Sequence, residues 1–139
     1  MSELDKNVNS RYRLWMPDDF ALTIIDNPEA VEQVCNGVGS GLLAKVIPDT
    51  IWFMDATPSS DIHDWMYTEP EYFENDEIGF AYKRKADRVF LNNICRQVDA
   101  TKSWRWIKYL RKSRARKYYF TLKYFGGPAF WNGKTIGDL

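Results

Sequence analysis

The chain has no long hydrophobic run, only one histidine and only two cysteines. No stretch approaches the roughly 20 apolar residues that cross a bilayer, and the charged start, MSELDKNVNSRYRLW, does not resemble a secretion signal. We therefore expect a soluble, cytoplasmic protein. Cys35 and Cys95 are too few for a disulfide scaffold, so both are expected to be reduced. One histidine with two distant cysteines also cannot supply a zinc site of the usual spacing.

No linker, internal repeat or low-complexity run divides the 139 residues. A chain of this length can bury enough surface to be stable as one unit, so residues 1–139 are expected to form a single domain. Two further kinds of site are disfavoured. The stretch GVGSG lacks the Gly-Lys-Ser/Thr of a Walker loop. Ser59 and Ser60 precede His63 on the same expected helix, which is poor geometry for a Ser-His-Asp triad.

Charge is divided unevenly along the chain, although the net charge is zero. Residues 1–80 hold 16 acidic and 4 basic side chains, and residues 81–139 hold 3 acidic and 15 basic ones. Between Lys102 and Phe125 there are nine Lys or Arg and no acid, with Trp and Tyr among them. This composition is typical of contact with phosphates or an anionic membrane surface. Packing of the basic half against the acidic half is an equally good explanation.

Capping residues and apolar spacing predict a mainly helical protein. One helix is expected to begin at Asn27 and to end at the glycine loop NGVGSG, and another is expected to follow Thr57 as N-cap. The stretch between them, VIPDTIWFMDATPSS, is interpreted as irregular or turn-rich. Apolar residues at spacings of three and four predict a long helix over Glu77–Val98. A last helix is expected over Ser103–Phe125, which Lys112 and Ser113 could interrupt.

The last helix is expected to have two different aromatic faces. The first carries Trp104, Ile107, Leu110, Ala115, Tyr118 and Leu122. The nearly opposite face carries Trp106, Tyr109, Phe120 and Tyr124, set among basic side chains. This second face could pack in the core, against another subunit or against lipid headgroups. In the lipid case, the basic residues expected to contact the membrane include Lys102, Arg105, Lys108 and Arg111.

Asp87 interrupts the apolar pattern of the helix expected over Glu77–Val98. At about 100° per residue it projects between Phe90 and Ile94, inside the apolar arc. A carboxylate placed there is costly unless it is hydrogen-bonded across the interface. His63 is the expected partner.

The expected pair of His63 and Asp87 suggests general-base chemistry. Asp87 would fix the tautomer of His63, which could then take a proton from water. Asp64 points about 100° away from His63 on a helix, so it needs another role. Calcium accepts carboxylate and carbonyl oxygens together, and the loop CNGVGSG could supply the carbonyls and place Ca²⁺ beside an ester substrate. A lone histidine is commonly structural, however, and a purely structural His63–Asp87 pair remains the alternative.

The same residues resemble a known family, the secreted phospholipase A2 superfamily with its shorter viral and bacterial relatives. HDWMY is similar to that family's His-Asp-x-x-Tyr helix, ADRVF to the Asp-Arg segment of the antiparallel partner helix, and CNGVG to the glycine calcium loop. The stretches VIPDTIW, IHDWMY, ADRVFLNN and YFGGPAFW also look like phage and prophage proteins of this type. The resemblance then covers about residues 33–131.

The resemblance implies a phospholipase A2-like fold, with two antiparallel core helices plus N- and C-terminal helices. It implies calcium-dependent hydrolysis of a phospholipid acyl ester, with His63 as the base, Asp87 as its partner and Tyr67 as a hydrogen-bond donor to Asp87. It implies a Ca²⁺ ion held by Asp64 and by the backbone carbonyls of Cys35, Gly37 and Gly39. The Gly37 amide would help to stabilise the oxyanion.

Three features depart from the secreted enzymes. Their disulfides are absent, the spacer between Gly39 and His63 is several residues longer, and PEYFENDEIG replaces the hairpin between the two core helices. The competing function is a non-enzymatic module that binds nucleic acid or a virion component through the basic aromatic helix. A third class is an interaction protein that uses Trp106 and Tyr109 on a partner. The expected place of action is the cytoplasm, the host membrane or a virion.

Overall fold

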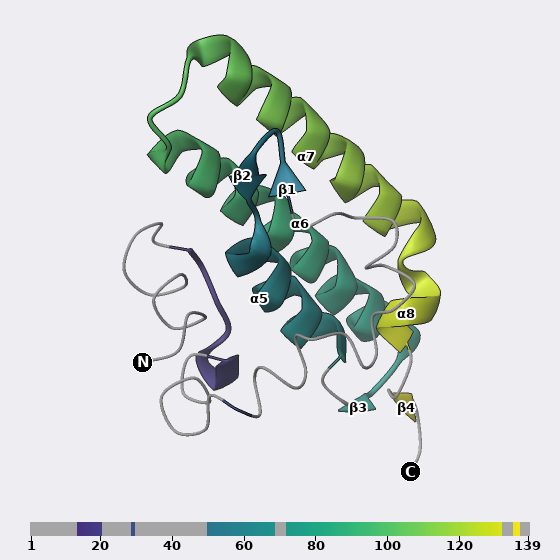
Figure 1. The fold of residues 1–139 in the computed structure, drawn as a ribbon. Coiled ribbons are helices and arrows are strands. Elements are labelled where there is room, and N and C mark those ends of the chain that lie inside the picture. The colour runs from purple at the N-terminus through teal and green to yellow at the C-terminus, as the bar shows by residue number, and fades with distance from the viewer. Residues whose placement is uncertain (1–13, 21–28, 30–49, 69–71, 132–134, 137–139) are drawn as a thin grey trace.

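The computed structural model describes residues 14–20, 29, 50–68, 72–131 and 135–136 (Figure 1). These residues are mainly helical, as the sequence predicted, and none of the helices among them is long and apolar enough to cross a membrane. The predicted helix beginning at Asn27 lies almost entirely outside the described residues. The helices whose bounds the structure describes are α5 Thr57–Thr68, α6 Asp76–Ala100, α7 Arg105–Phe125 and α8 Gly127–Trp131. The short strands are β1 Thr50–Ile51, β2 Met54–Asp55, β3 Tyr72–Phe73 and β4 Thr135–Ile136.

The helices α5, α6 and α7 form the body of the described structure, each reversing the direction of the one before (Figure 1). The start of α6 is fixed by Asn75, whose side chain accepts a hydrogen bond from the Ile78 amide at 2.9 Å. Two acids follow in the first turn, near the positive end of the helix dipole. Thr57 was predicted to be the N-cap of α5 but is the first residue of the helix. The Asp55 side chain accepts a hydrogen bond from the Thr57 amide at 2.9 Å.

Helices α5 and α6 supply many residues of the core. The fully buried apolar residues on these two helices include Ile62, Met66, Ala86, Phe90, Ile94 and Val98. Gln97 fixes the pairing at one end, because it accepts a hydrogen bond from Ser59 on α5 and donates to the Asp55 carbonyl at 3.0 Å. Asn93 holds the N-terminal segment against α6 through two hydrogen bonds with the backbone of Trp15, at 2.8 and 3.0 Å.

Helix α7 lies along α6 and runs without interruption from Arg105 to Phe125. The break considered near Lys112 and Ser113 does not occur. Ala115 and Leu122 are fully buried on the face predicted to be apolar. Trp104 was placed on that face but is 74% exposed, because it precedes the first turn of the helix.

A hairpin formed by β1 and β2 occupies part of the stretch interpreted as irregular. Its turn residues, Trp52 and Phe53, have φ angles of 45° and 65°, a region that few residues other than glycine and asparagine adopt. Arg111 on α7 holds this turn, since its guanidinium donates twice to the Trp52 carbonyl, at 2.8 and 3.1 Å. Figure 1 shows the hairpin beside the middle of α7.

At the other end of the helices, α8 closes the core with aromatic residues. The Phe130 ring is fully buried and its centroid lies 5.3 Å from that of Tyr67. Strands β3 and β4 pair in parallel beside it. Trp131 packs so closely on α6 that a Cβ at position 79 would lie 2.1 Å from its ring, so a side chain there would displace Trp131.

Candidate functional site

The structure brings together three of the residues singled out in the sequence. His63 and Tyr67 lie one turn apart on α5, and Asp87 faces them from the middle of α6. The His63 Nε2 atom is 3.1 Å from Asp87 Oδ1, and the Tyr67 hydroxyl donates to the same oxygen. The contact expected between His63 and Asp87 is therefore present, and it arises because antiparallel packing places these turns opposite each other.

A fourth residue, Lys83, belongs to this cluster and was not foreseen from the sequence. Its Nζ atom lies 2.8 Å from Asp87 Oδ2, the oxygen that His63 does not use, and 2.8 Å from the Leu122 carbonyl of α7. Lys83 precedes Asp87 by one helical turn, so it lies on the same face. The spacing of four residues between Lys83 and Asp87 could have indicated this contact, because a lysine one turn from a buried carboxylate can neutralise its charge.

The cluster is almost fully shielded from solvent. The exposed fractions are 3% for His63, 2% for Tyr67, 1% for Asp87 and 5% for Lys83. The His63 ring has the Tyr67 ring on one side, with centroids 4.0 Å apart, and Phe90 nearby at 5.0 Å. Buried charges are tolerated only when they are paired and hydrogen-bonded, and both carboxylate oxygens of Asp87 meet that condition.

Burial and hydrogen bonding set the charge states of the pair. Burial alone would raise the pKa of Asp87, but hydrogen bonds from His63, Lys83 and Tyr67 outweigh it and lower that pKa below 3.8. The pKa of His63 is lowered from 6.5, chiefly because burial disfavours the imidazolium, although Asp87 acts in the opposite direction. Burial and the nearby carboxylate raise the pKa of Tyr67, so its hydroxyl remains a donor.

These charge states determine the tautomer of His63. At neutral pH, Asp87 is a carboxylate and can only accept, so the proton of the neutral imidazole lies on Nε2 and points to Asp87. The other ring nitrogen, Nδ1, is then the basic one. The arrangement can therefore accept a proton at Nδ1 and stabilise the resulting imidazolium with Asp87.

The predicted calcium ligands lie mostly outside the described residues. Cys35, Gly37 and Gly39 are among the residues that the structure does not describe. Asp64 is described; it lies next to His63 on α5 and is partly buried. Its carboxylate is a donor of the type that Ca²⁺ accepts. Within the described ranges, no three His, Cys, Asp or Glu side chains are grouped to hold a metal. Such a grouping involves side chains only, whereas the other predicted calcium ligands are backbone carbonyls.

The outward side of α7 carries the predicted mixture of basic side chains and aromatic rings. Trp106, Tyr109, Phe120 and Tyr124 are between 50% and 68% exposed. These four residues are called the α7 outer face below. Arg111 does not contribute to the exposed basic side chains, because it is buried and bound to the hairpin turn. The prediction that Arg111 contacts the membrane was therefore wrong.

No protein-family model, curated protein or solved structure matches this chain.

Proposed function

We propose that this chain is a calcium-dependent phospholipase A2-like acyl-ester hydrolase of phage or prophage type. The observation that supports the proposal most directly is the buried contact between His63 Nε2 and Asp87 Oδ1 across two antiparallel helices. The Tyr67 hydroxyl supports it further, because it donates to the same carboxylate from the same face of α5 as His63. The resemblance in sequence motifs assigns these three residues the corresponding roles.

In the proposed reaction, a water molecule is the nucleophile. His63 Nδ1 removes its proton as the oxygen attacks the ester carbonyl, and the imidazolium then gives that proton to the departing alcohol. Asp87 stabilises the imidazolium and keeps the ring oriented, and Tyr67 keeps the carboxylate in place. Asp64 and the carbonyls of Cys35, Gly37 and Gly39 would hold Ca²⁺, which polarises an ester carbonyl when bound.

The membrane is the proposed place of action, because α7 carries both the exposed rings of the α7 outer face and basic side chains. Amphipathic Trp and Tyr are favoured at the interface between water and lipid, and Lys or Arg attract anionic headgroups. Lys102, Arg105 and Lys108 remain in the proposed contact. Replacing these three residues with Gln should weaken binding to anionic vesicles but spare turnover of a soluble monomeric ester.

The deciding experiment measures fatty-acid release from phospholipid vesicles with calcium and with a chelator. Wild-type protein should release fatty acid only with calcium, and His63→Gln should abolish release while the circular dichroism spectrum stays unchanged. Asp64→Asn should raise the calcium requirement sharply, whereas Asp61→Asn, a matched change on the same helix, should not. Unchanged turnover in His63→Gln would refute the enzymatic role.

The second candidate is a module that binds nucleic acid or a virion component, with the buried cluster serving only stability. The exposed rings of the α7 outer face favour it as well, since bases can stack on aromatic side chains among Lys and Arg. Binding of the purified protein to DNA and RNA should then weaken steeply with salt. Strong salt-dependent binding together with absent lipid hydrolysis would select this candidate.

A further inference from the structure

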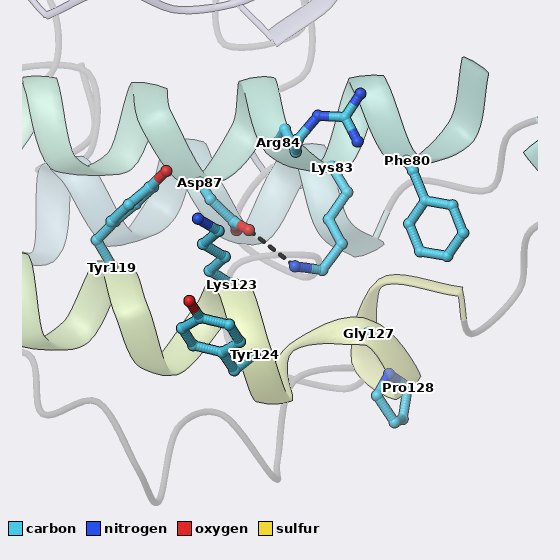
Figure 2. Close-up of a pocket in the computed structure, with 9 residues that line it drawn as sticks. All are labelled: Phe80, Lys83, Arg84, Asp87, Tyr119, Lys123, Tyr124, Gly127 and Pro128. Carbon is cyan, nitrogen blue, oxygen red and sulfur yellow. Dashed lines mark hydrogen bonds and ion pairs between the residues drawn. The ribbon is translucent and has the colours of Figure 1, made fainter. Parts of the chain in front are cut away.

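A cavity of about 320 Å³ lies between α6, the last turns of α7 and the start of α8. Figure 2 shows that Lys83 and Asp87 reach into it from α6 and that Lys123 and Tyr124 reach into it from α7. Its volume is at the lower end of the range of about 300–1,000 Å³ that is usual for small-molecule sites. Asp87 and Tyr124 also belong to the sites discussed above, but the cavity itself has no role in those functions.

The charged residues that line this cavity are three cations and one acid. The cations are Lys83, Arg84 and Lys123, and the acid is Asp87. Asp87 is buried and already accepts hydrogen bonds from Lys83, His63 and Tyr67, so it has little capacity to attract a further cation. The lining therefore has an excess of positive charge, and the complementary ligand is an anion.

Lys83 provides a fixed donor at the bottom of the cavity. Two of the three N–H groups of its ammonium are directed to Asp87 Oδ2 and the Leu122 carbonyl, both at 2.8 Å. The third N–H can be donated to an anion in the cavity. Because Lys83 is only 5% exposed and is held at two points, it loses little freedom when a ligand binds.

Aromatic rings form the remaining walls. Phe80, Tyr119 and Tyr124 line the cavity, and the ammonium of Lys123 lies 5.5 Å from the centre of the Tyr124 ring. An inorganic anion would leave these apolar walls without contacts. A ligand with a charged end and a planar apolar body would use both parts of the cavity, since small-molecule sites combine apolar walls with a few polar groups.

We propose that this cavity binds an organic phosphate monoester, with the phosphate between Lys83 and Lys123 and the organic part against the tyrosine rings. A phosphate dianion suits a lining that holds three cations better than a carboxylate does, because it carries more charge and more acceptor oxygens. The ester is either a soluble compound or the headgroup of a phosphorylated lipid. The site does not depend on the hydrolytic activity proposed above.

The site also lies next to the buried cluster. An anion that accepts a hydrogen bond from Lys83 changes the charge around Asp87, whose other oxygen contacts His63. Since His63 is the only histidine in the chain, its imidazole resonances report this change without overlap from another histidine.

The test titrates the full chain with phenyl phosphate, inorganic phosphate and phenol, and follows heat and the His63 resonances. Phenyl phosphate should saturate below about 10 mM and bind more tightly than either of the other two compounds. The His63 resonances should shift along the same curve. Saturation without any shift of His63 would overturn the proposal, and so would failure to saturate together with no binding to the phosphatidic acid vesicles described below.

Matched double variants locate the site. Arg84→Met with Lys123→Met should weaken binding at least about tenfold, because both cations line the cavity. Arg88→Met with Lys117→Met removes two exposed charges from the same helices outside the cavity and should leave affinity within about twofold. Equal losses in the two variants would overturn the proposal.

The same pair of variants identifies the source of the phosphate. The variants are compared on vesicles of phosphatidic acid and on vesicles of phosphatidylcholine. If the Arg84 and Lys123 variant loses binding to phenyl phosphate while the Arg88 and Lys117 variant keeps it, the ligand is a soluble ester. If the two variants differ only in binding to phosphatidic acid vesicles, the ligand is a lipid headgroup. If neither probe distinguishes the two variants, the proposal is wrong.

Discussion

The hydroxyl of Tyr67 lies 2.9 Å from the position that a Cβ at Gly126 would occupy. The same Cβ would be 2.5 Å from the Leu122 carbonyl oxygen, which accepts the hydrogen bond of Lys83. The turn between α7 and α8 therefore comes so close to the buried cluster that only glycine fits at this position.

Gly126→Ala should lower the free energy of unfolding by about 1–3 kcal/mol, because the added methyl group displaces either the Leu122 carbonyl or the Tyr67 side chain. Urea denaturation measures the change. Gly127→Ala is the matched control, since nothing lies within 4 Å of the Cβ it would add. The control should change stability by less than about 0.5 kcal/mol. Similar effects of both substitutions would contradict the close packing described for Gly126.

Stability should fall as the pH drops below about 6.5, the ordinary pKa of histidine. Because burial lowers the pKa of His63 in the folded state, the unfolded chain binds its proton first, and acidification favours unfolding. The loss continues until the pH reaches the lowered pKa of the folded state. Asp87 adds a second loss below pH 3.8, because its pKa is also lowered by folding.

Urea denaturation between pH 8 and pH 5 tests the contribution of His63. Since the chain has no other histidine, His63→Gln should remove most of the slope in that range. A slope that persists unchanged in His63→Gln would show that another group is responsible.

Asp87→Asn should destabilise the fold by about 3–5 kcal/mol, because it leaves the buried charge of Lys83 without its carboxylate. The double variant Lys83→Met with Asp87→Asn should recover part of this loss, since no buried charge then remains unpaired. Asp99→Asn removes an exposed ion pair with Lys112 and should cost no more than about 1 kcal/mol. Thermal or urea unfolding of the wild type, these three variants and Lys83→Met alone measures the differences, and additivity of Lys83→Met and Asp87→Asn would argue against the Lys83–Asp87 pair.

Phe53→Gly should raise the free energy of unfolding by about 1 kcal/mol, because Phe53 has a φ of 65° that costs little for glycine. The Phe53 side chain is 95% exposed, so its removal loses little packing. Ala81→Gly, at an exposed position inside α6, should lower stability by about 1 kcal/mol. If Phe53→Gly destabilises the protein, the exposed ring makes a contact that offsets its backbone strain.

The sequence predicted the pairing of α5 and α6 because Asp87 breaks an otherwise regular apolar pattern. A carboxylate inside an apolar arc requires a partner, and His63 was the polar residue on the neighbouring helix with a matching companion in Tyr67. The bounds of α6 were also predicted to within two residues at each end, since its apolar spacing extends over six turns. The phospholipase A2-like fold, the calcium site and the catalytic roles remain predictions.

Other features depended on contacts that a sequence pattern does not contain. The hairpin turn at Trp52 and Phe53 has neither Gly nor Asn, the residues that normally indicate such a turn, because Arg111 on a distant helix holds it in place. Arg111 was predicted to be an exposed cation, because the sequence pattern does not contain its contact with this turn. Lys83 could have been found from its position one turn before Asp87, but its second acceptor, the Leu122 carbonyl, depends on how α7 packs.

The bond from Lys83 to Leu122 has a consequence for the order in which the chain is completed. A nascent chain that ends at Ala100 already contains His63, Tyr67, Lys83 and Asp87. Its lysine, however, lacks the carbonyl that anchors it until about two dozen more residues have left the ribosome and α7 has docked. The His63 pair thus reaches its final surroundings only after α7 has docked, so termination after α6 yields a fragment that carries all four side chains without the carbonyl that anchors Lys83.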